Sequence, residues 1–399
     1  MKSNNKVLFL IIDGLGDSAI PEFNGKTPLE SANTPNLDQL AKNGACGSVN
    51  AFLMPPFKLP DSSLSHFAAF GYDPKKYFPG RGICEALGVN FKLKEGDVAL
   101  RVNFGTVDEN LIIVDRRAGR IADTSELVKA ISGIKIDGVS FIVKDSMSHR
   151  AVLVLRGTNI SDKITDNDKK KMGIKPLRIK PRDKSREAIF TAKVLNEFLE
   201  KAHEILKVHP LNKKRKLPAN YLLVRGVGKM KVIPSFEEKH GMKAVCIAGG
   251  DLYKGIARAL GMKVLSVKGS NIFFDTNLKG EINSSVRSLK DNDFVFWHIK
   301  ATDSLAEDGN FIKKRLFIER IDREIFPLMN LKNTLLVITS DHSTCSLKKS
   351  HCKKLIPTII SGPKVKADSV SSYSEKSCLR GSLGKMEQLN LMKKVKSFL

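Results

Sequence analysis

The stretch Val7-Leu8-Phe9-Leu10-Ile11-Ile12-Asp13 indicates the fold, because a short run of bulky apolar residues ends on a carboxylate. The pattern returns where Phe294–Ile299 leads to Asp303. It returns again where Leu335–Thr339 leads to Asp341-His342. Runs this short and apolar are typical of buried parallel strands, whose carboxyl ends form the ligand-binding edge of an α/β sheet. A lone Asp there would be a helix cap or turn residue, but three together predict a metal site.

The chain has 399 residues, of which 42% are hydrophobic and 27% charged, as in an ordinary globular protein of roughly two or three domains. No apolar run approaches the roughly 18–20 residues that a membrane span needs, and the first residues do not resemble a signal peptide. The six cysteines are scattered and predict a reduced, cytoplasmic protein with free thiols. Cys345 and Cys352 could be thiolate ligands of a metal, but we favour small buried side chains.

The net charge of +25 raises the question of an anionic partner. A basic surface can bind nucleic acid or attract a small anionic substrate. The lysines are spread along the chain, and with one Trp and five Tyr no basic run carries the aromatic residues on which bases stack. Solvated lysine-rich faces are therefore the leading explanation, attraction of an anionic substrate is second, and a nucleic-acid partner is a distant third. The oligomeric state stays open.

Three consecutive parts of the chain differ in texture. Residues 1–90 and 234–399 alternate apolar strands with helices, as in a mostly parallel sheet flanked by helices. Residues 91–233 carry shorter, alternating segments that predict a smaller α+β domain with an antiparallel sheet. The sequence therefore predicts one α/β domain that is interrupted by an inserted domain.

The candidate metal ligands are of two chemical kinds. Carboxylates suit hard cations such as Mg²⁺ and Mn²⁺, whereas imidazole is acceptable to Mn²⁺ and Zn²⁺. The whole set suits Mn²⁺ or Zn²⁺ better than Mg²⁺ alone, and it comprises Asp13, Asp303, Asp341, His342 and His351. Two such ions about 3.5–4 Å apart can clamp the attacking and leaving oxygens in phosphoryl transfer.

A serine near residue 62 is the candidate nucleophile, because a metal-bound hydroxyl is a common one. Ser62 lies in an irregular loop just before the apolar helical run 67–70, whose N-terminal amides would favour a phosphoryl group. Spacing alone leaves Ser62, Ser63 and Ser65 as alternatives, and by that criterion a helix-capping role is favoured. Basic residues that could hold an anionic substrate are Arg116, Arg117, His149, Arg150, Arg225 and Lys254.

Short motifs recur in order along nearly the whole chain. They are Ile12-Asp13-Gly14, Thr27–Ala32, Thr34–Asp38, Gly71–Pro74, Gly80-Arg81-Gly82, Glu85–Gly88, Val114–Ile121, His149–Leu153, Pro234–Lys239, Ile247–Gly250, Lys300–Asp303, Asp341–Thr344 and Arg380–Gly384. In these motifs the chain resembles the archaeal-type, 2,3-bisphosphoglycerate-independent phosphoglycerate mutases of the alkaline phosphatase superfamily. The resemblance implies an alkaline-phosphatase-like α/β domain with two divalent metal ions, and an inserted domain that holds the phosphoglycerate.

The resemblance also implies an activity. The phosphoryl group would move from the substrate to a serine, the glycerate would reorient, and the group would return to its other hydroxyl. This reaction interconverts 3-phosphoglycerate and 2-phosphoglycerate in glycolysis and gluconeogenesis, with no 2,3-bisphosphoglycerate. The alternatives are a divergent metal-dependent phosphotransferase or phosphatase that acts on another small alcohol or phosphoester, and a basic binding protein on a decayed enzyme scaffold.

The resemblance assigns roles by position, and it selects Ser62 as the nucleophile. One metal would be held by Asp13, Ser62, Asp341 and His342. The other would be held by Asp303 and His351. The substrate-side groups would be His149, Arg150, Asp166, Asp168 and Arg225.

Two positions depart from the family pattern. From the nucleophilic serine onward the family usually reads Ser-Asp-Thr-Ala-His. Here Ser62 is followed by Ser63 in place of the Asp, so a carboxylate is missing. Glu307 stands where the family has a metal-binding His, one helical turn after Asp303. A Glu ligand is expected to move the preference toward harder ions, with Mn²⁺ favoured and Mg²⁺, Co²⁺ or Zn²⁺ as alternatives.

Overall fold

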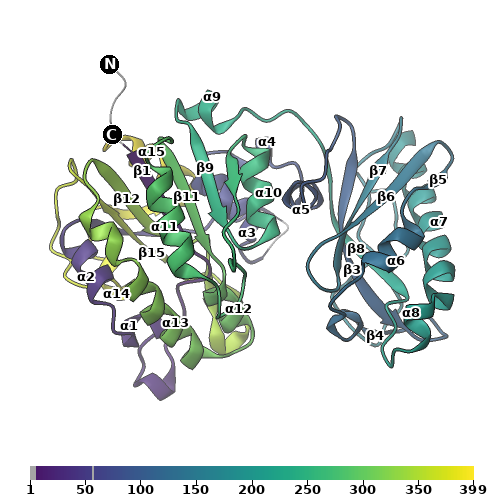
Figure 1. Ribbon diagram of the computed structural model, residues 1–399, viewed down its shortest axis with the longest axis horizontal. Coiled ribbons are helices and arrows are strands. Elements are labelled where there is room, and N and C mark those ends of the chain that lie inside the picture. The colour runs from purple at the N-terminus through teal and green to yellow at the C-terminus, as the bar shows by residue number, and fades with distance from the viewer. Residues whose placement is uncertain (1–5, 56–57) are drawn as a thin grey trace. The chain divides into compact units, whose positions relative to one another are not determined.

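The computed structural model describes residues 6–55 and 58–399 (Figure 1). The chain forms two compact units. The core unit comprises Met1–Phe78 and Pro234–Leu399, and the inserted unit comprises Pro79–Ile233. The first boundary lies earlier than the predicted residue 90, because the helix Arg81–Gly88 packs its apolar side chains against strands of the inserted unit.

The core unit is built on an eight-stranded sheet with the order β10-β9-β11-β1-β12-β15-β2-β16. Its strands are β1 (Lys6–Ile12), β2 (Ala45–Asn50), β9 (Ala244–Ala248), β10 (Lys263–Leu265), β11 (Phe294–Ile299), β12 (Thr334–Thr339), β15 (Ile356–Ser361) and β16 (Gly384–Glu387). All neighbours pair in parallel except β15, which is antiparallel to both β12 and β2. The predicted fold class, a mostly parallel α/β sheet, is confirmed.

Helices cover this sheet on both faces (Figure 1). The helices of this unit are α1 (Pro28–Ser31), α2 (Pro35–Lys42), α3 (Ser62–Ala69), α4 (Pro74–Tyr77), α9 (Phe236–His240), α10 (Asp251–Ala259), α11 (Leu278–Ser288), α12 (Ala301–Glu307), α13 (Phe311–Glu324), α14 (Glu375–Cys378) and α15 (Leu391–Lys396). The alternation of β1 explains why both faces need cover. Leu8 and Leu10 join the cluster that includes residues of α2, α11 and α13, whereas Phe9 packs against Phe70 and Phe294 on the other side.

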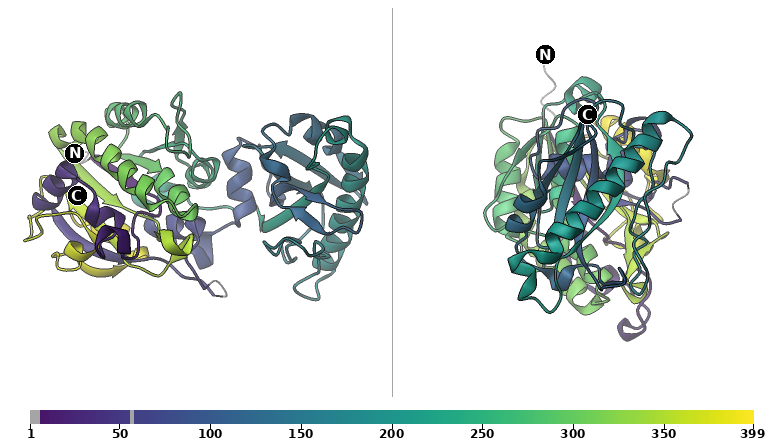
Figure 2. Two further views of the ribbon diagram at one scale, coloured as in Figure 1. Left: turned by 90° about the horizontal axis from the view of Figure 1, so that it is seen from below. Right: turned by 90° about the vertical axis from the view of Figure 1, so that its right-hand side faces the viewer.

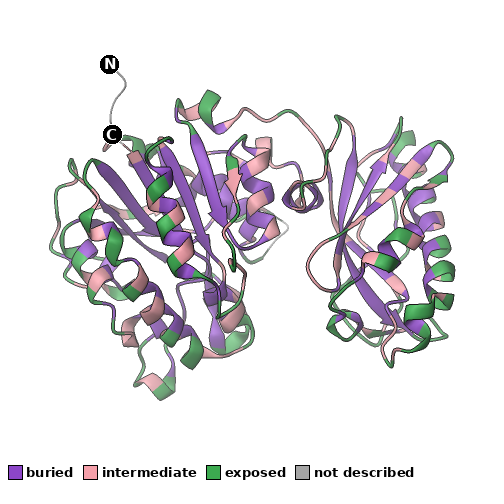
Figure 3. Ribbon diagram, in the orientation of Figure 1, coloured by how far each residue is buried: buried purple, intermediate pink, exposed green. Residues whose placement is uncertain are grey.

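The three runs that define the sequence pattern lie next to one another in the order β11-β1-β12 and are buried along their length (Figure 3). Ile12 is paired with Ile299 of β11, and Ile11 is paired with Thr339 of β12. Because all three strands are parallel, their carboxyl ends meet at one edge of the sheet.

A small hairpin beyond this edge corrects one prediction. It consists of β13 (Ser343–Cys345), the 3-10 turn η4 (Ser346–Lys348) and β14 (Ser350–Cys352). Cys345 and Cys352 form a disulfide across it, so the prediction of free thiols is wrong for these two residues. Both are buried, as we favoured, and the disulfide excludes the alternative of a thiolate ligand. The other four cysteines are free and buried.

The inserted unit has a sheet of order β4-β3-β7-β6-β5, with β8 paired to β3. Its strands are β3 (Val98–Val107), β4 (Ile113–Asp115), β5 (Ile134–Ile136), β6 (Val139–Asp145), β7 (Arg150–Arg156) and β8 (Tyr221–Lys229), and its helices are α5 (Arg81–Gly88), α6 (Ser125–Ile131), α7 (Arg186–Val208) and α8 (Pro210–Lys213). All its strand pairs are antiparallel. Figure 2 shows α7 along one face of this sheet, where Phe198 stacks on Phe141.

The other face of the inserted sheet is covered differently. Ile83 and Ala86 of α5 pack there against Ala99, Val152 and Val154. Within the described ranges, no helix is long and apolar enough to cross a membrane.

Candidate metal centre and anion-binding residues

The carboxyl ends of the three central strands bring the predicted ligands together. Asp13 directly follows β1, Asp303 lies in the first turn of α12 after β11, and Asp341-His342 follows β12. His351 arrives from β14 of the hairpin. Two groups have ligand atoms within 4.8 Å of one another, namely Asp13 with Asp341 and His342, and Asp303 with His342 and His351. The sequence assigned His342 to one metal alone, whereas the geometry places it in both groups.

Ser62 faces this cluster. Its Oγ lies 2.9 Å from Nε2 of His342. The capping role belongs to Asp61, whose carboxylate accepts a hydrogen bond from the amide of Ser63 at 2.9 Å. Ser62 is the first residue of α3, so its hydroxyl is not needed as the cap. This geometry favours Ser62 over Ser63, which spacing alone could not do.

The cluster has the properties of a site for cations. Asp13 Oδ1 and Asp341 Oδ2 are buried and have no hydrogen-bond partner in the described part of the chain. Buried carboxylate oxygens are costly unless they are paired or coordinate a metal. A divalent cation between them would satisfy both, so the residues present fit the metal that the sequence predicted.

Electrostatics separate the two carboxylates. Burial opposes the charge of Asp13, but Lys300 and His298 outweigh it and hold the pKa of this carboxyl well below its usual range. Burial and the charge of Asp13 raise the pKa of Asp341 well above its usual range. A ligating carboxylate must be deprotonated, so a bound cation would oppose the rise in the pKa of Asp341.

Three residues around Asp13 had no predicted role. Its Oδ2 accepts hydrogen bonds from Tyr253 Oη at 2.5 Å and pairs with His298 Nε2 at 3.1 Å. Lys300 Nζ lies 3.2 Å from the same oxygen and 2.5 Å from Asp303 Oδ2. A signal for His298 and Lys300 was available, because they stand at the end of β11 beside the end of β1. Tyr253 belongs to α10 and had no such signal.

His66 was also missed. It lies one turn after Ser62 on α3, and its Nδ1 is 2.6 Å from the Ser62 carbonyl oxygen. The same nitrogen is 3.7 Å from Asp341 Oδ2. Burial and the neighbouring His298 lower the pKa of His66 to about 3, so this imidazole is neutral at physiological pH. The spacing of four residues from Ser62 would have placed it on the same helical face.

Glu307 lies at the rim of the cluster. It is the last residue of α12, and its side chain is 53% exposed. Its Oε1 lies 3.8 Å from His351 Nε2, and Asp303 Oδ1 lies 3.7 Å from the same nitrogen. Asp303 and Glu307 therefore approach the same imidazole from α12.

All but one of the predicted substrate-side residues belong to the inserted unit. Arg116 binds Asp168 through two hydrogen bonds of 3.0 and 2.5 Å, and Arg225 lies 3.6 Å from the same carboxylate. Asp166 accepts a hydrogen bond from the amide of Gly226. The remaining predicted residues of this unit are Arg117, which follows β4, and His149 and Arg150 at the start of β7.

Lys254 is the exception. It lies on α10 of the core unit and pairs with Asp251 at 3.6 Å. The structure therefore does not bring it together with the arginines within one unit.

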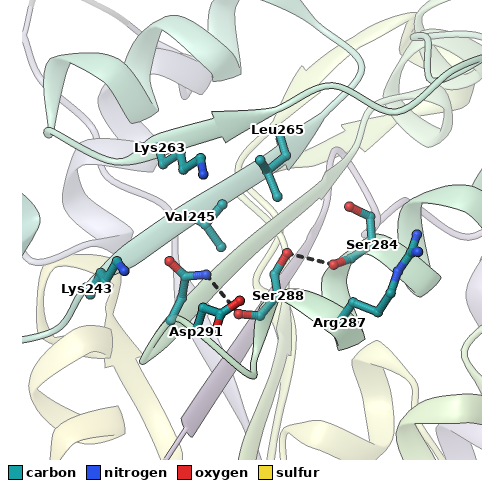
Figure 4. Close-up of a pocket in the computed structure, with 9 residues that line it drawn as sticks. Lys243, Val245, Lys263, Leu265, Ser284, Arg287, Ser288 and Asp291 are labelled. Atoms are coloured by element: carbon teal, nitrogen blue, oxygen red, sulfur yellow. Dashed lines mark hydrogen bonds between the residues drawn. The ribbon is translucent and has the colours of Figure 1, made fainter.

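A separate pocket of about 290 Å³ lies near the ends of the core sheet at which β9 and β10 begin, away from the carboxyl ends that carry the candidate ligands (Figure 4). Lys243 and Lys263 stand where β9 and β10 begin, and Ser284, Arg287 and Ser288 belong to the last turns of α11. The carboxyl end of a helix disfavours anions. The charged side chains here are exposed, and the buried polar residues Ser288 and Asn292 donate their hydrogen bonds to carbonyl oxygens of α11, so the pocket offers little to hold an anion.

The fold and the cluster define a class of protein: an α/β domain that gathers carboxylate and imidazole ligands at the carboxyl edge of its sheet, with an arginine-rich second unit inserted. The family model described as 2,3-bisphosphoglycerate-independent phosphoglycerate mutase matches residues 41–212. The mutase of that name from Methanococcus aeolicus is 44% identical over 95% of this chain and 94% of its own length.

Solved structures agree. The cofactor-independent phosphoglycerate mutase from Thermoplasma acidophilum is 37% identical with a TM-score of 0.72, and the match covers 98% of this chain and 99% of that one. A Pyrococcus horikoshii protein is 32% identical with a TM-score of 0.85, over 99% of this chain and 97% of that one. The chain therefore belongs to the 2,3-bisphosphoglycerate-independent phosphoglycerate mutases, a family of isomerases.

The disulfide generates a prediction, because it closes the hairpin that carries His351. Replacing Cys345 and Cys352 by Ala removes a cross-link over a sequence separation of 7, which in the chain-entropy model contributes roughly 2–3 kcal/mol. We expect the Kd for Mn²⁺, measured by calorimetry, to rise several-fold. The control Cys84→Ala removes a buried thiol of the inserted unit that forms no disulfide, and it should leave the Kd unchanged. Equal affinities for all three proteins would contradict this prediction.

His149 generates a prediction about pH. Burial and the neighbouring Arg150 and Arg117 lower its pKa to about 3, whereas an unfolded His titrates near 6.5. Above about pH 6.5 the residue is neutral in both states and contributes no pH dependence. Between about 6.5 and 3 only the unfolded chain binds the proton, so the free energy of unfolding falls as the pH drops. We expect His149→Gln to flatten this fall in urea denaturation at several pH values. An unchanged slope would count against it.

Proposed function

We propose that the chain interconverts 3-phosphoglycerate and 2-phosphoglycerate through a phosphoserine intermediate at a two-metal site. The reaction would serve glycolysis and gluconeogenesis in the cytoplasm, and it would need no 2,3-bisphosphoglycerate. The observation that carries the proposal is the position of the Ser62 hydroxyl, 2.9 Å from His342 in the cluster of candidate metal ligands. Family membership supports the substrate, a small phosphorylated anion.

Each ligand group would hold one cation. Asp13, Asp341 and His342 form the first group, and Asp303, His351 and Glu307 surround the second, with His342 close to both. Bound divalent cations, Mn²⁺ by preference, would neutralise phosphoryl oxygens and lower the pKa of the serine hydroxyl.

The remaining chemistry belongs to side chains of the chain itself. Ser62 would lose its proton and attack the phosphorus, the bond from phosphorus to the glycerate oxygen would break, and that oxygen would take up a proton. The other glycerate hydroxyl would then lose its proton and attack the phosphoserine, which returns Ser62 to its protonated form. The N-terminal amides of α3 would favour the phosphoryl group on Ser62. Lys300 contacts both Asp13 and Asp303, and its charge would limit the repulsion between the acidic ligands and an anionic substrate.

The inserted unit would hold the glycerate during its reorientation. Arg225 and Arg116 flank Asp168, which fixes their guanidinium groups and leaves further donors for an anion. His149 is neutral, since its pKa lies at about 3, and it would act as a hydrogen-bonding group rather than a cation. Asp61 directly precedes Ser62, but its carboxylate accepts hydrogen bonds from the amides of Ser63 and Leu64 as the cap of α3, so it does not replace the carboxylate missing at position 63.

Ser62 is tested by a coupled assay from 3-phosphoglycerate to 2-phosphoglycerate with added Mn²⁺ and no bisphosphoglycerate. We expect Ser62→Ala to lower kcat by at least about a thousandfold, because the phosphoserine cannot form. Ser63→Ala is the matched control and should retain most of the activity. Turnover that survives Ser62→Ala would sink the mechanism. A parent that hydrolyses phosphoesters but does not isomerise would favour the phosphatase alternative, which Ser63 and Glu307 motivate.

Glu307 is tested through metal selectivity. If its carboxylate is a ligand, Glu307→Gln should weaken binding of the second Mn²⁺ roughly tenfold or more, and Glu307→His should shift the preference toward Zn²⁺ or Co²⁺. Calorimetric titration with each ion gives the affinities independently of turnover. Asp308→Asn removes the neighbouring exposed carboxylate and serves as the control. Identical affinities for parent and Glu307→Gln would exclude Glu307 as a ligand.

A further inference from the structure

One sequence motif has no role in the mechanism above. It begins at Gly80-Arg81-Gly82, continues to Glu85, and forms α5 of the inserted unit. A Cβ at Gly82 would lie 2.1 Å from the carbonyl oxygen of Ala99, so only glycine lets this helix approach the backbone of β3 so closely. The close approach places α5 beside Arg101, two residues further along β3.

Glu85 lies between two guanidinium groups. Its Oε1 is 3.2 Å from Nε of Arg81 and 3.5 Å from Nη1 of Arg101. Glu85 is only 8% exposed, and the side chain of Arg101 is 10% exposed. A carboxylate buried in this way fixes the orientation of the guanidinium groups that it contacts.

Arg101 is surrounded by other positively charged arginines. It is paired directly with Arg225 on the antiparallel neighbour β8, an arrangement that destabilises a sheet unless something compensates it. Burial, with the charges of Arg81, Arg225 and Arg150, holds the pKa of Arg101 well below its usual range, and burial lowers that of Arg225 to about 10. Two carboxylates contact this cluster, Glu85 at Arg101 and Asp168 at Arg225.

Donors in the cluster remain unused. Nε of Arg101 and Nε of Arg150 are both buried and have no hydrogen-bond partner in the ranges that the structure describes. Unpaired buried donors of charged groups are costly, so a bound oxyanion would relieve them and the repulsion together.

We infer that Arg101 binds an oxyanion of the substrate and that Glu85 is a positioning residue that holds Arg101 and Arg81 for this contact. The inference rests on the proposed function for the identity of the substrate. The recognised chemistry is an anionic group with two acceptor oxygens, which matches both the carboxylate and the phosphoryl group of phosphoglycerate.

The test measures binding to the full chain with Mn²⁺ present and Ser62→Ala as background, so that the probe is not turned over. The probes are 3-phosphoglycerate, D-glycerate and inorganic phosphate. Arg101→Met should raise the Kd for 3-phosphoglycerate roughly 10- to 100-fold, as for the loss of a hydrogen bond to a charged group. Arg101→Lys keeps the charge but lacks the planar guanidinium group, so its Kd should lie between those of the background protein and Arg101→Met. If the Arg101 variants bind D-glycerate more weakly but bind phosphate normally, Arg101 contacts the carboxylate of the substrate. If they bind only phosphate more weakly, Arg101 contacts the phosphoryl group.

Glu85→Gln separates positioning from charge. We expect the Kd to rise about tenfold, and the double variant Glu85→Gln/Arg101→Met to bind no more weakly than Arg101→Met alone, because Glu85 acts through Arg101. Tighter binding by Glu85→Gln would mean that Glu85 merely opposes the substrate charge, and it would overturn the positioning role. In the Ser62-intact enzyme, the same substitution should raise KM more than it lowers kcat.

A matched control guards against general loss of structure. Asp97→Asn breaks another ion pair of the inserted unit, with Arg156, and should lower the Tm without changing the Kd. The inference is overturned if the Arg101 variants bind 3-phosphoglycerate as the background does, even where the parent is an active mutase, or if the chain binds no probe. If the parent is inactive but binding depends on Arg101, the proposed function fails and the inference stands.

Discussion

The parallel register of β11, β1 and β12 is the constraint on which the candidate site depends. The pairing of Ile12 with Ile299 and of Ile11 with Thr339 fixes where Asp13 lies relative to the segments that follow the other two strands. Residues more than 300 positions apart in the chain meet only because their strands end at one level. A slip of one residue in β1 would turn Asp13 to the other face of the sheet, so burial of both faces also protects the geometry of the cluster.

Strands and candidate ligands could be predicted from the sequence where the signal was local. The apolar runs at 7–12, 294–299 and 335–339 are each bounded by polar residues and are long enough to specify a strand. Each also carries its ligand just beyond its own end, so strand and ligand come from the same stretch. Ser62 needed the family resemblance, because neighbouring serines offered the same spacing to any local criterion.

What could not be predicted depends on partners distant in sequence or on an exact register. The disulfide depends on the β13–β14 hairpin, in which Ser343 is paired with Cys352, and no local sequence signal indicates that hairpin. The first domain boundary was placed too late because α5 has an ordinary amphipathic pattern, and only its partners on β3 and β7 show which unit it joins. Arg101 stands inside a strand, where alternation identifies the face that it occupies but not the charges opposite it.

His342 has a consequence for how such a site can change over time. Because the buried imidazole of His342 belongs to both ligand groups, a substitution of this residue disturbs the two groups together. The same holds for Asp13, which is tied to Tyr253, His298 and Lys300 at once. A substitution that alters only one ligand group is possible at the rim of the cluster, where a half-exposed side chain can be replaced without disturbing buried neighbours. Glu307 occupies that position, so the periphery of the cluster is where related proteins can diverge while their interior stays fixed.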